Sequence, residues 1–523
     1  MDSQILKVSI LPGEYWWGGT TMYKKCPIHS GNEYHEDFRE KSQNQTSPFF
    51  VSSMGRYIWS DEPFKVDVTG GVFTIEDGSP TLTTAGTSLR EAYMAAQKAH
   101  FPCDQVKLRP DFFRSAQYNT WMEFTYYPTQ EGVLRYAKEW LDRGFKPGIF
   151  IIDEGWHQHT DYGHWEFDFA RFPDPKKMVT ELHELGYKVM LWVVPFVSPN
   201  GPRFVSSMLP KIGADPEAAE RLYMRTETGE VALMKWWNGT SAILDMTNPY
   251  DVHFLDDQLQ HLIRDYGVDG FKFDGGTLGH FCNSSVVNGC YRTEHTPAEL
   301  NAAWNEFGRR YPFHEYKDTF KGGGKNVIQR LHDRFHTWEG HGIDDILPCA
   351  IVNGLIGHPF TCPDMVGGGS WTTRLQPGFK ADEELFVRMA QVSALFPMMQ
   401  FSWAPWEDLS PKNVALCLDA ANLHSAMSDE ILQLVDEATL TGEPILRCLE
   451  YNDPHQGYEL IEDEFMLGED ILVAPVVTKG TFKRKVTFPA GQWQDQEGTV
   501  YDGHTVQQLN APLEKLLWFR RVK

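Results

Sequence analysis

The sequence lacks several features that mark other classes of protein. No apolar run is long enough to cross a bilayer, and the N-terminus lacks the basic segment followed by an apolar segment of a secretory leader. The eight cysteines are scattered singly without a CxxC pair, which argues against a disulfide framework and against a zinc site. We therefore expect a cytoplasmic protein that uses neither a metal nor another cofactor.

Positive charge is also scarce. The chain has 48 lysines and arginines against 71 aspartates and glutamates, which gives a formal net charge of −23. Nucleic acids and anionic membranes both require clustered basic residues, so we expect neither as a partner.

Aromatic residues are abundant at 13%, with 17 tryptophans. Tryptophan is costly to expose, so these residues either fill a large core or form stacking platforms of the kind used by sugar sites.

The two ends of the chain have the pattern of β-structure. Short apolar or alternating runs separated by Gly, Pro, Asp and Ser predict an N-terminal β-sandwich over residues 1–105 and a C-terminal β-domain over residues 437–523. The clearest runs are 56–60, 64–68 and 71–76 near the start, and 443–451, 465–477 and 483–493 near the end.

Residues 106–436 instead alternate strand-like runs with amphipathic helices, which is typical of βα units around a parallel sheet. About eight such units predict a (β/α)8 TIM barrel. An open doubly wound sheet is the alternative, but no Gly-rich phosphate loop follows the first strand. We therefore expect a multidomain α/β fold. The predicted strands are 119–127, 147–156, 187–196, 268–274, 326–331, 358–366 and 397–402, and the clearest helices are 174–186 and 252–266.

Polar side chains stand where the predicted barrel strands end, which is where TIM barrels place their active sites. The strand 268–274 puts Lys272 and Asp274 on one face and Phe271 and Phe273 on the other. A carboxylate beside an apolar strand costs free energy unless it is paired or used. The pattern therefore indicates either a buried structural Lys–Asp pair or a catalytic carboxylate. Polar and aromatic residues at other strand ends are Asp153, Glu154, Trp156, Arg330, Asp333, Asp364, Gln400, Ser402, Trp403 and Trp406.

Carboxylates with tryptophans and no metal-ligand cluster are the inventory of a glycoside hydrolase. These enzymes place two carboxyl groups beside the bond that is cleaved, about 5–5.5 Å apart when the configuration is retained. Metal catalysis by His157 and His159 is an alternative, because barrel metallohydrolases use such H-x-H pairs. However, their stretch has the character of an exposed loop, and no further histidine stands at a strand end in metal-ligand order.

Several stretches resemble glycoside hydrolase family 31 over nearly the whole chain, namely KPGIFIIDEGW, GYKVMLWVVPFVSP, GVDGFKFDGG, PDMVGGG, EELFVRMAQVSALFPMMQFS, FMLGEDILVAPVV and FPAGQW. KWWNGTSAILDMTNP and MQFSWAPW resemble the branch that contains the myogenesis-regulating glycosidase. The resemblance implies a retaining α-glycosidase with a catalytic barrel and a carbohydrate substrate. The branch implies cleavage of a terminal α-linked galactose. The alternatives are α-glucosidase or α-xylosidase action, and a non-catalytic sugar-binding homologue. A homo-oligomer is compatible with the sequence.

The resemblance assigns Asp274 as the nucleophile and Asp333 as the acid/base. The second assignment rests on the Arg-x-x-Asp-Arg pattern of Arg330, Asp333 and Arg334. The wider family often has W-x-G-D nearby, and TWEGH puts His341 where that aspartate would fall. The alternative role for Asp333 is that of a structural partner of an arginine. The sugar contacts expected are Trp121, Asp153, Glu154, Trp236, Trp237, Lys272, Lys317, Arg330, Asp364 and Trp403.

Two positions depart from the branch pattern. Lys317 stands where an arginine is expected, and its ammonium lacks the fork geometry of a guanidinium, so a different hydroxyl could be held. Gly275, Gly276 and Thr277 follow the nucleophile where the branch often has an acidic residue as the third. We expect Lys272 to favour the ionised form of Asp274, and the glycines to leave room for the substrate.

Overall fold

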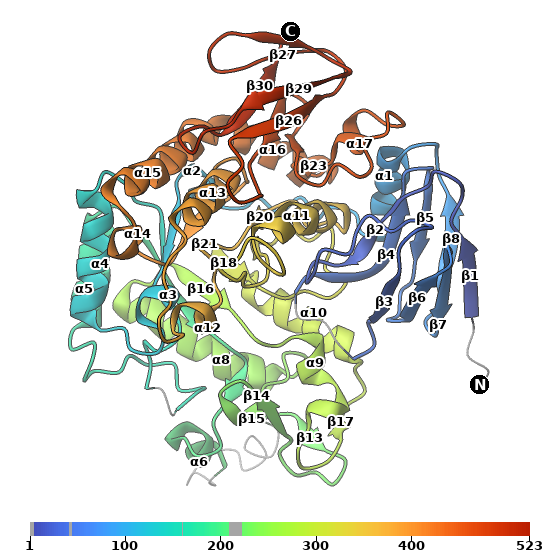
Figure 1. The fold of residues 1–523 in the computed structure, drawn as a ribbon. Helices are drawn as coiled ribbons and strands as arrows, with labels where there is room; N and C mark the ends of the chain where they lie inside the picture. The colour runs from blue at the N-terminus through green and yellow to red at the C-terminus, as the bar shows by residue number, and fades with distance from the viewer. Residues whose placement is uncertain (1–4, 41–43, 159–160, 209–221, 523) are drawn as a thin grey trace. The chain divides into compact units, whose positions relative to one another are not determined.

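The structure is a computed structural model that describes residues 5–40, 44–158, 161–208 and 222–522 (Figure 1). The chain forms two compact units. The first unit comprises residues 1–39, 45–116 and 322–523, and the second unit comprises residues 40–44 and 117–321.

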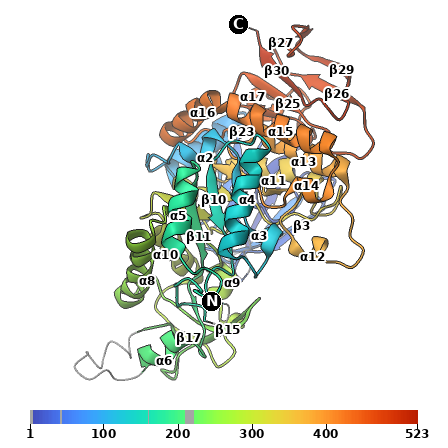
Figure 2. The ribbon, with the colours of Figure 1, turned by 90° about the vertical axis from the view of Figure 1, so that its left-hand side faces the viewer.

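The second unit contains a parallel sheet of the kind predicted for a barrel. Its five strands pair in the order β9, β10, β11, β16 and β18, and all residues of β10 and β16 are buried. Helices connect the strands, and α4 and α5 pack side by side in front of β10 and β11 (Figure 2). Burial on both faces explains the continuous apolar runs in the sequence. The elements are β9 (Gln117–Asn119), α4 (Gln130–Asp142), β10 (Ile149–Ile152), α5 (Pro175–Glu184), β11 (Lys188–Val193), α8 (Pro249–His261), β16 (Gly270–Phe273), α10 (Pro297–Gly308) and β18 (Phe313–Tyr316).

Smaller elements of the second unit lie in the connections between these strands. An antiparallel sheet pairs β12 with β15 and β15 with β14, and β13 pairs with β17. Their bounds are α3 (Trp121–Phe124), β12 (Phe196–Val197), α6 (Pro202–Met208), β13 (Arg225–Thr226), β14 (Leu233–Trp236), β15 (Gly239–Ile243), α9 (Leu278–Phe281) and β17 (Tyr291–Arg292).

The predicted helices 174–186 and 252–266 are confirmed by their capping residues. In α5 the Asp174 side chain accepts a hydrogen bond from the backbone N–H of Lys177 at 3.0 Å, and Pro175 occupies the first turn. Helix α8 begins a few residues earlier than predicted because Asn248 caps it. A π-helical turn over Leu262–Tyr266 extends α8 to Gly267, which ends it with φ +83°.

Two predictions for this unit are wrong in detail. The strand predicted over 119–127 ends at Asn119, because the Asn119 side chain accepts a hydrogen bond from the Trp121 N–H at 2.7 Å and the chain turns into helix α3. Strand β18 lies outside the predicted runs, and it follows β16 in the sheet where the sequence predicts the run 326–331. The reason is that β18 is only four residues long and carries the polar residues His314 and Glu315, although all four residues are buried.

The N-terminal part of the first unit is a β-sandwich, as predicted. Two antiparallel four-stranded sheets pair in the orders β1-β7-β6-β3 and β2-β4-β5-β8, and Phe50 of one sheet contacts Phe73 of the other with ring centroids 5.5 Å apart. Helix α1 (Leu89–His100) was not predicted; the Ser88 side chain caps it by accepting from the N–H of Glu91. The strands are β1 (Ile5–Ser9), β2 (Trp16–Thr20), β3 (Tyr34–Asp37), β4 (Thr46–Ser52), β5 (Arg56–Trp59), β6 (Lys65–Thr69), β7 (Val72–Glu76) and β8 (Thr81–Thr84).

The first unit also holds four short parallel strands that fall inside the predicted runs 326–331, 358–366 and 397–402. They pair as β19 with β20 and β21 with β22. The bounds are α2 (Asp111–Arg114), β19 (Gln329–Arg330), α11 (Ile346–Leu355), β20 (Thr361–Cys362), β21 (Met365–Val366), α12 (Trp371–Arg374), α13 (Glu383–Ala394), β22 (Gln400–Phe401), α14 (Pro405–Asp408), α15 (Pro411–Ala426) and α16 (Ser428–Thr441).

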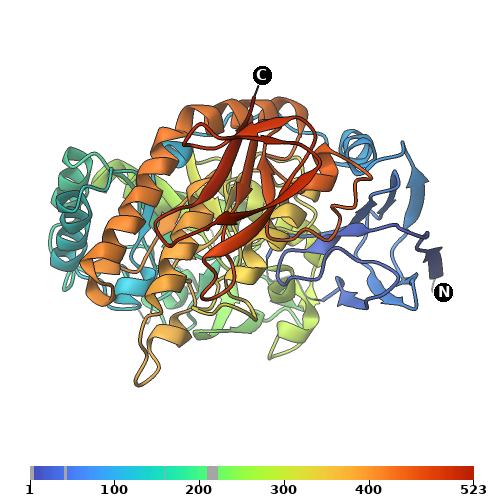
Figure 3. The same ribbon diagram turned by 45° about the horizontal axis from the view of Figure 1, so that its top comes forward.

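The C-terminal strands form the predicted β-domain beside α13 and α15 (Figure 3). Trp493, Phe488 and Phe519 are central to its core. Arg388 of α13 is fully buried and donates to the carbonyl oxygen of Ala511 at 2.8 Å. The predicted strand 443–451 is wrong in its second half, which is helix α17. The elements are β23 (Leu446–Arg447), α17 (Leu449–Asn452), β24 (Phe465–Leu467), β25 (Ile471–Ala474), β26 (Lys483–Phe488), β27 (Gln492–Gln494), β28 (Val500–Asp502), β29 (Thr505–Asn510) and β30 (Leu517–Arg521).

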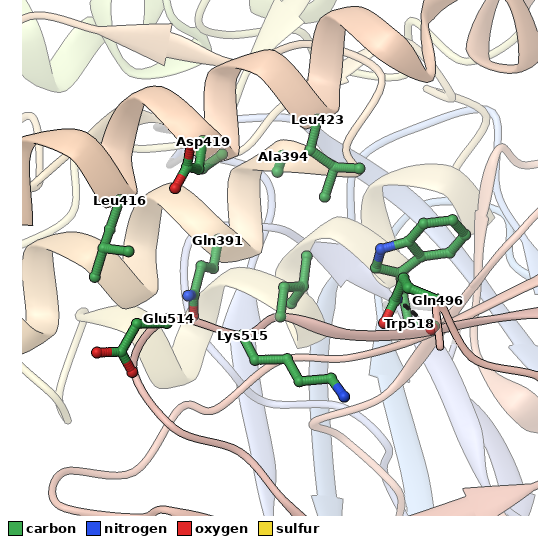
Figure 4. Close-up of a pocket in the computed structure, with 11 residues that line it drawn as sticks. Gln391, Ala394, Leu416, Asp419, Leu423, Gln496, Glu514, Lys515 and Trp518 are labelled. Atoms are coloured by element: carbon green, nitrogen blue, oxygen red, sulfur yellow. Dashed lines mark hydrogen bonds between the residues drawn. The ribbon is translucent and has the colours of Figure 1, made fainter. Parts of the chain in front are cut away.

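A cavity of about 220 Å³ lies where α13 and α15 meet the C-terminal strands (Figure 4). Leu416, Ala420 and Leu423 line its helical side, and Trp518 and Gln496 line the opposite side. None of the predicted sugar-contacting or catalytic residues lines this cavity. It is therefore a feature of the packing between helices and β-domain, separate from the candidate site.

Candidate active site

Asp274 immediately follows the buried strand β16. Its Oδ2 accepts a hydrogen bond from Trp192 Nε1 at 3.0 Å, and its Oδ1 accepts from the backbone N–H of Gly275 at 2.9 Å. Burial by itself would raise the pKa of Asp274. The positive charges of Lys317 and Lys272, together with the two hydrogen bonds, outweigh that effect and hold the pKa below its ordinary value of 3.8. Asp274 is therefore an ionised, oriented carboxylate at neutral pH.

Lys272 forms a buried ion pair, but its partner is Asp153. Lys272 Nζ lies 2.6 Å from Asp153 Oδ2, and both side chains are 3% exposed. Asn119 Nδ2 donates to the same oxygen at 2.7 Å, and the backbone N–H of Glu154 donates to Asp153 Oδ1 at 2.8 Å. The structural pair that the sequence left open was between Lys272 and Asp274, whereas the ion pair found here is between Lys272 and Asp153. The charge of Lys272 still acts on Asp274.

Glu154 has the opposite protonation state. Burial, together with the nearby carboxylates of Asp153 and Asp274, raises the pKa of Glu154 to about 8, although a hydrogen bond from Tyr162 opposes the change. Tyr162 donates to Glu154 Oε1 at 2.7 Å, and Asn238 Nδ2 donates to the same oxygen. Glu154 is thus largely protonated near neutral pH, so it can donate a hydrogen bond to a bound oxygen.

The three tryptophans expected in this unit differ in exposure. Trp237 is 51% exposed, whereas Trp236 is buried and donates from Nε1 to Ser241 Oγ at 3.0 Å. Trp121 is also buried and packs against Tyr126. Trp237 therefore offers the most open ring for stacking.

Lys317 directly follows strand β18 and is half-buried. Asn44 Nδ2 donates to the Lys317 carbonyl oxygen at 2.7 Å, which fixes the backbone at this point. Of the two lysines, Lys317 lowers the pKa of Asp274 more.

The glycines after the nucleophile are required by backbone geometry and by packing. Gly275 and Gly276 have φ values of +62° and +60°, which favour glycine. A Cβ atom would lie 2.7 Å from the Phe196 ring at Gly275 and 2.4 Å from the Trp304 ring at Gly276. Thr277 is then the N-cap of helix α9. That these glycines leave room for the substrate stays a prediction.

For the described residues of the stretch 156–165, the expectation of an exposed loop is wrong. His157, Asp161 and Tyr162 are buried, and the His157 ring packs against Tyr162, Trp165 and Trp156. His159 lies outside the described residues. Aromatic packing outweighs the polar composition here, and it brings Tyr162 to Glu154. Sequence reasoning missed Tyr162 for this reason, and it missed Trp192 because that residue stands in a uniformly apolar strand.

Asp333 belongs to the first unit and follows β19. Its side chain is 24% exposed, and its Oδ1 accepts from Arg330 Nη1 at 2.8 Å. Arg330 also pairs with the buried carboxylate of Asp364. The ion pair named as the structural alternative for Asp333 is present, and it leaves part of the carboxyl group accessible.

Asp364 is held by protein groups on several sides. Its Oδ2 accepts from the backbone N–H of Arg334 at 2.6 Å and of Gly369 at 2.9 Å, and its φ of +106° is unusual for a residue with a side chain. Burial raises the pKa of Asp364, and the Arg330 charge opposes this rise. A Cβ on Gly369 would lie 2.7 Å from Asp364 Oδ1 and 3.1 Å from Asp333 Oδ1. In this arrangement Asp364 fixes Arg330, which in turn orients Asp333.

Trp403 lies in the core of the first unit. It has no exposed surface, its Nε1 donates to Asp408 Oδ2 at 2.7 Å, and its ring packs against His336 and Phe386. Gln400 and Ser402 are also buried. His341, which stands where the wider family often has an aspartate, has its Nδ1 atom 3.4 Å from Asp345 Oδ2.

The described part of the chain contains no helix long and apolar enough to cross a membrane. Among the same residues, no cluster of three or more His, Cys, Asp or Glu side chains could hold a metal ion.

Two family models match the chain. The TIM-barrel domain of glycosyl hydrolases family 31 matches residues 110–416, and the C-terminal domain of the same family matches residues 442–522. The myogenesis-regulating glycosidase of Mus musculus is 31% identical over 413 residues, which covers 77% of this chain and 55% of that protein. The SITS-binding protein of Tetronarce californica is 32% identical over 324 residues, which covers 56% of this chain and 42% of that protein. The chain thus spans about half the length of these relatives.

A solved structure shows the same fold. The family 31 α-xylosidase from a soil metagenome, complexed with xylose, superposes with a TM-score of 0.80 over 99% of this chain and 79% of that chain, at 21% identity. The predicted multidomain α/β fold, with a TIM barrel and additional β-rich regions toward both termini, is therefore confirmed. By the two domain matches and the similarity to the mouse glycosidase, the chain belongs to glycoside hydrolase family 31.

Proposed function

We propose that the chain is a retaining α-glycosidase that hydrolyses a terminal α-linked galactose from oligosaccharides or glycosides. The observation that carries this proposal is the state of Asp274, a carboxylate kept ionised by two lysines and oriented by two hydrogen bonds at the end of a barrel strand. Membership of family 31 supports the class of reaction. Galactose as the sugar is supported only by the resemblance of KWWNGTSAILDMTNP and MQFSWAPW to the branch of the myogenesis-regulating glycosidase.

In the proposed reaction Asp274 attacks the anomeric carbon and forms a β-linked glycosyl-enzyme, while Asp333 gives its proton to the leaving oxygen. Asp333 then removes a proton from water, which attacks the same carbon and restores the α configuration. Lys272 and Lys317 keep Asp274 anionic before the attack. Arg330 and Asp364 would orient Asp333 for both proton transfers.

The sugar would be held mainly by groups of the second unit. Asp153 would accept hydrogen bonds from hydroxyl groups, and protonated Glu154 would donate one. Trp237 would stack on an apolar face of the ring. Further proposed contacts are Trp121, Trp236, Lys317 and Trp403. Trp403 is fully buried, so its side chain would have to move to contact the sugar. The domain division at residues 105 and 436 and the cytoplasmic location stay predictions.

An α-xylosidase or α-glucosidase is the second candidate. The likeness to the soil-metagenome α-xylosidase favours it, because galactose, glucose and xylose differ in few groups and the fold accommodates xylose in that protein. A site that pairs a particular hydroxyl can discriminate strongly between such sugars, because the wrong sugar leaves buried polar groups unpaired.

The test is hydrolysis of p-nitrophenyl α-galactoside, α-glucoside and α-xyloside by the wild type and by Asp274→Ala and Asp333→Ala, with and without azide. We expect cleavage of the galactoside and no turnover by Asp274→Ala. Azide should rescue Asp274→Ala with formation of a β-galactosyl azide, and Asp333→Ala with formation of an α-galactosyl azide. Asp257→Ala, which removes an exposed carboxylate of α8, is the control and should retain activity.

If the wild type prefers the glucoside or the xyloside, the proposed mechanism stands, but glucose or xylose replaces galactose as the sugar that is cleaved. If none of the three glycosides is cleaved but calorimetry still detects sugar binding, the proposed glycosidase activity is contradicted. A non-catalytic sugar-binding protein is then favoured.

A further inference from the structure

The turn that follows Asp274 presents a histidine that the proposed mechanism does not use. Thr277 is the N-cap of helix α9, and His280 is the third residue of that helix. The backbone N–H of Thr277 donates to His280 Nδ1 at 3.1 Å, and Thr277 Oγ1 lies 2.9 Å from the same nitrogen. The loop that carries the nucleophile is thereby tied to the histidine ring.

This contact determines the tautomer of His280. A backbone N–H can only donate, so Nδ1 must be unprotonated and accept. Burial lowers the pKa of His280 to about 4, and the negative charge of Asp274 opposes this shift only in part. The ring is therefore neutral at neutral pH and carries its single proton on Nε2.

The Nε2–H group has a fixed direction. The ring contacts Phe196 at a centroid distance of 5.0 Å and Trp237 at 6.1 Å. The His280 carbonyl oxygen accepts from Ser285 Oγ at 2.7 Å and from Tyr291 OH at 2.9 Å, which holds the backbone. Among the described residues both hydrogen bonds of the ring involve Nδ1, and the Nε2–H makes none.

Phe196 links these features to the nucleophile. Its ring packs against His280 on one side and is so close to Gly275 that a Cβ there would clash at 2.7 Å. The half-exposed Trp237 also contacts Phe196, at 6.5 Å. Gly275, which directly follows Asp274, and the rings of Trp237 and His280 therefore all lie against Phe196 and belong to one local cluster of the second unit.

Resting on the proposed function, we propose that His280 is a specificity residue whose Nε2–H donates a hydrogen bond to a hydroxyl oxygen of the sugar attacked by Asp274. A neutral donor with a fixed direction is suited to reading the position of one hydroxyl group. It adds no charge beside the nucleophile. A sugar without an oxygen at that position would leave the N–H unpaired, which discriminates against it.

The experiment measures kcat/KM for the p-nitrophenyl α-glycoside that the wild type prefers and for its monodeoxy analogues. His280→Phe keeps an aromatic ring against Phe196 and Trp237 but removes both nitrogens. We expect it to lower kcat/KM for the parent glycoside by about 10–100-fold. For the analogue that lacks the hydroxyl bound by His280, the kcat/KM values of the wild type and the variant should agree within about threefold. The hydrogen bond is then absent from both enzymes.

Two further variants separate the contact from the capping of α9. Thr277→Val weakens the cap but leaves the backbone N–H and therefore the Nε2–H; it should preserve the wild-type pattern across the analogues. His280→Gln can keep a cap at the third helical position and restore an N–H donor, so it should recover part of the loss. Ratios between analogues within one preparation do not depend on the fraction of folded enzyme, so a poorly folding variant still tests the proposal.

Three results would overturn the role of His280. His280→Phe could lower kcat/KM equally on every analogue, or it could leave kcat/KM for the parent glycoside unchanged. Thr277→Val could also change the pattern across the analogues in the same way as His280→Phe. These outcomes are distinct from failure of the proposed function. That failure would appear as a wild type that cleaves no glycoside, or as full activity of Asp274→Ala, and the first of these would overturn the proposal for His280 as well.

Discussion

Lys272 Nζ and Asp153 Oδ2 lie 2.6 Å apart, and 119 residues separate the two in the sequence. Both side chains are almost fully buried, so each charge depends on the other for compensation. The pair joins β16 to the end of β10, and it places a positive charge beside the strand that delivers Asp274.

Lys272→Met should destabilise the protein by about 3–5 kcal/mol, because it leaves the Asp153 carboxylate buried without its partner. It should also raise the pKa of Asp274, since the Lys272 charge lowers it. The acid limb of the kcat/KM profile should therefore move to higher pH. Urea unfolding and the pH profile check the two effects.

The matched control is Lys138→Met. Lys138 pairs with Glu181 at 2.5 Å on the surface of the same unit, and such pairs contribute about 0–1 kcal/mol. Equal stability losses in the two lysine variants, or an unmoved acid limb for Lys272→Met, would contradict the interpretation.

Glu154 should make stability decrease as the pH rises. Burial raises the pKa of Glu154 from 4.5 to about 8, so between these values the folded state holds a proton that the unfolded state has released. The contribution is fully present below pH 4.5 and is lost as the pH rises through about 8. Glu154→Gln, which resembles the protonated form, should gain stability relative to the wild type between pH 5 and pH 8.

Urea unfolding of the wild type and Glu154→Gln at pH 5, 6.5 and 8 measures this difference. A constant difference across the three pH values would show that Glu154 has no raised pKa. Other buried carboxyl groups with raised pKa values, including Asp251 and Glu464, are common to both proteins and cancel in the comparison.

Gly369→Ala should impair proton transfer. The new methyl group would lie 2.7 Å from Asp364 Oδ1 and 3.1 Å from Asp333 Oδ1, so the carboxyl groups must shift. A glycoside with a poor leaving group depends on the acid, so its kcat/KM should fall by about 10–100-fold, and that of the p-nitrophenyl glycoside by less. Gly378→Ala is the control for a general loss of stability: nothing lies within 4 Å of its added Cβ, but its φ of +79° strains a residue with a side chain, so it should lower stability without a difference between the two substrates. Equal losses on the two substrates would argue against an acid role for Asp333.

Trp237→Ala should weaken substrate binding. The ring is 51% exposed and contacts His280 and Phe196, so its removal takes away stacking worth about 0.5–1.5 kcal/mol. We expect KM to rise by about 3–10-fold, in proportion to that energy. Phe169→Ala removes a similarly exposed aromatic residue of the same unit and should leave KM unchanged. A rise in KM in both variants would make the effect of Trp237 nonspecific.

The sequence by itself determined the alternation of strands and helices, the β-rich ends and the position of Asp274. These features have local causes. A buried strand requires an apolar run, α5 is bounded by Asp174, Pro175 and Gly186, and a turn at φ +62° and +60° requires Gly275 and Gly276. Some of the motifs that resemble family 31, such as KPGIFIIDEGW and GVDGFKFDGG, contain those same strands, and the domain matches then showed membership.

Only the tertiary structure decided the states and partners of the side chains. The choice of Asp153 as partner of Lys272, the raised pKa of Glu154, the burial of Tyr162 and Trp403, and the tautomer of His280 all depend on groups that the fold brings together. The physical reason is that desolvation and pairing act through space, whereas periodicity and capping act along the chain.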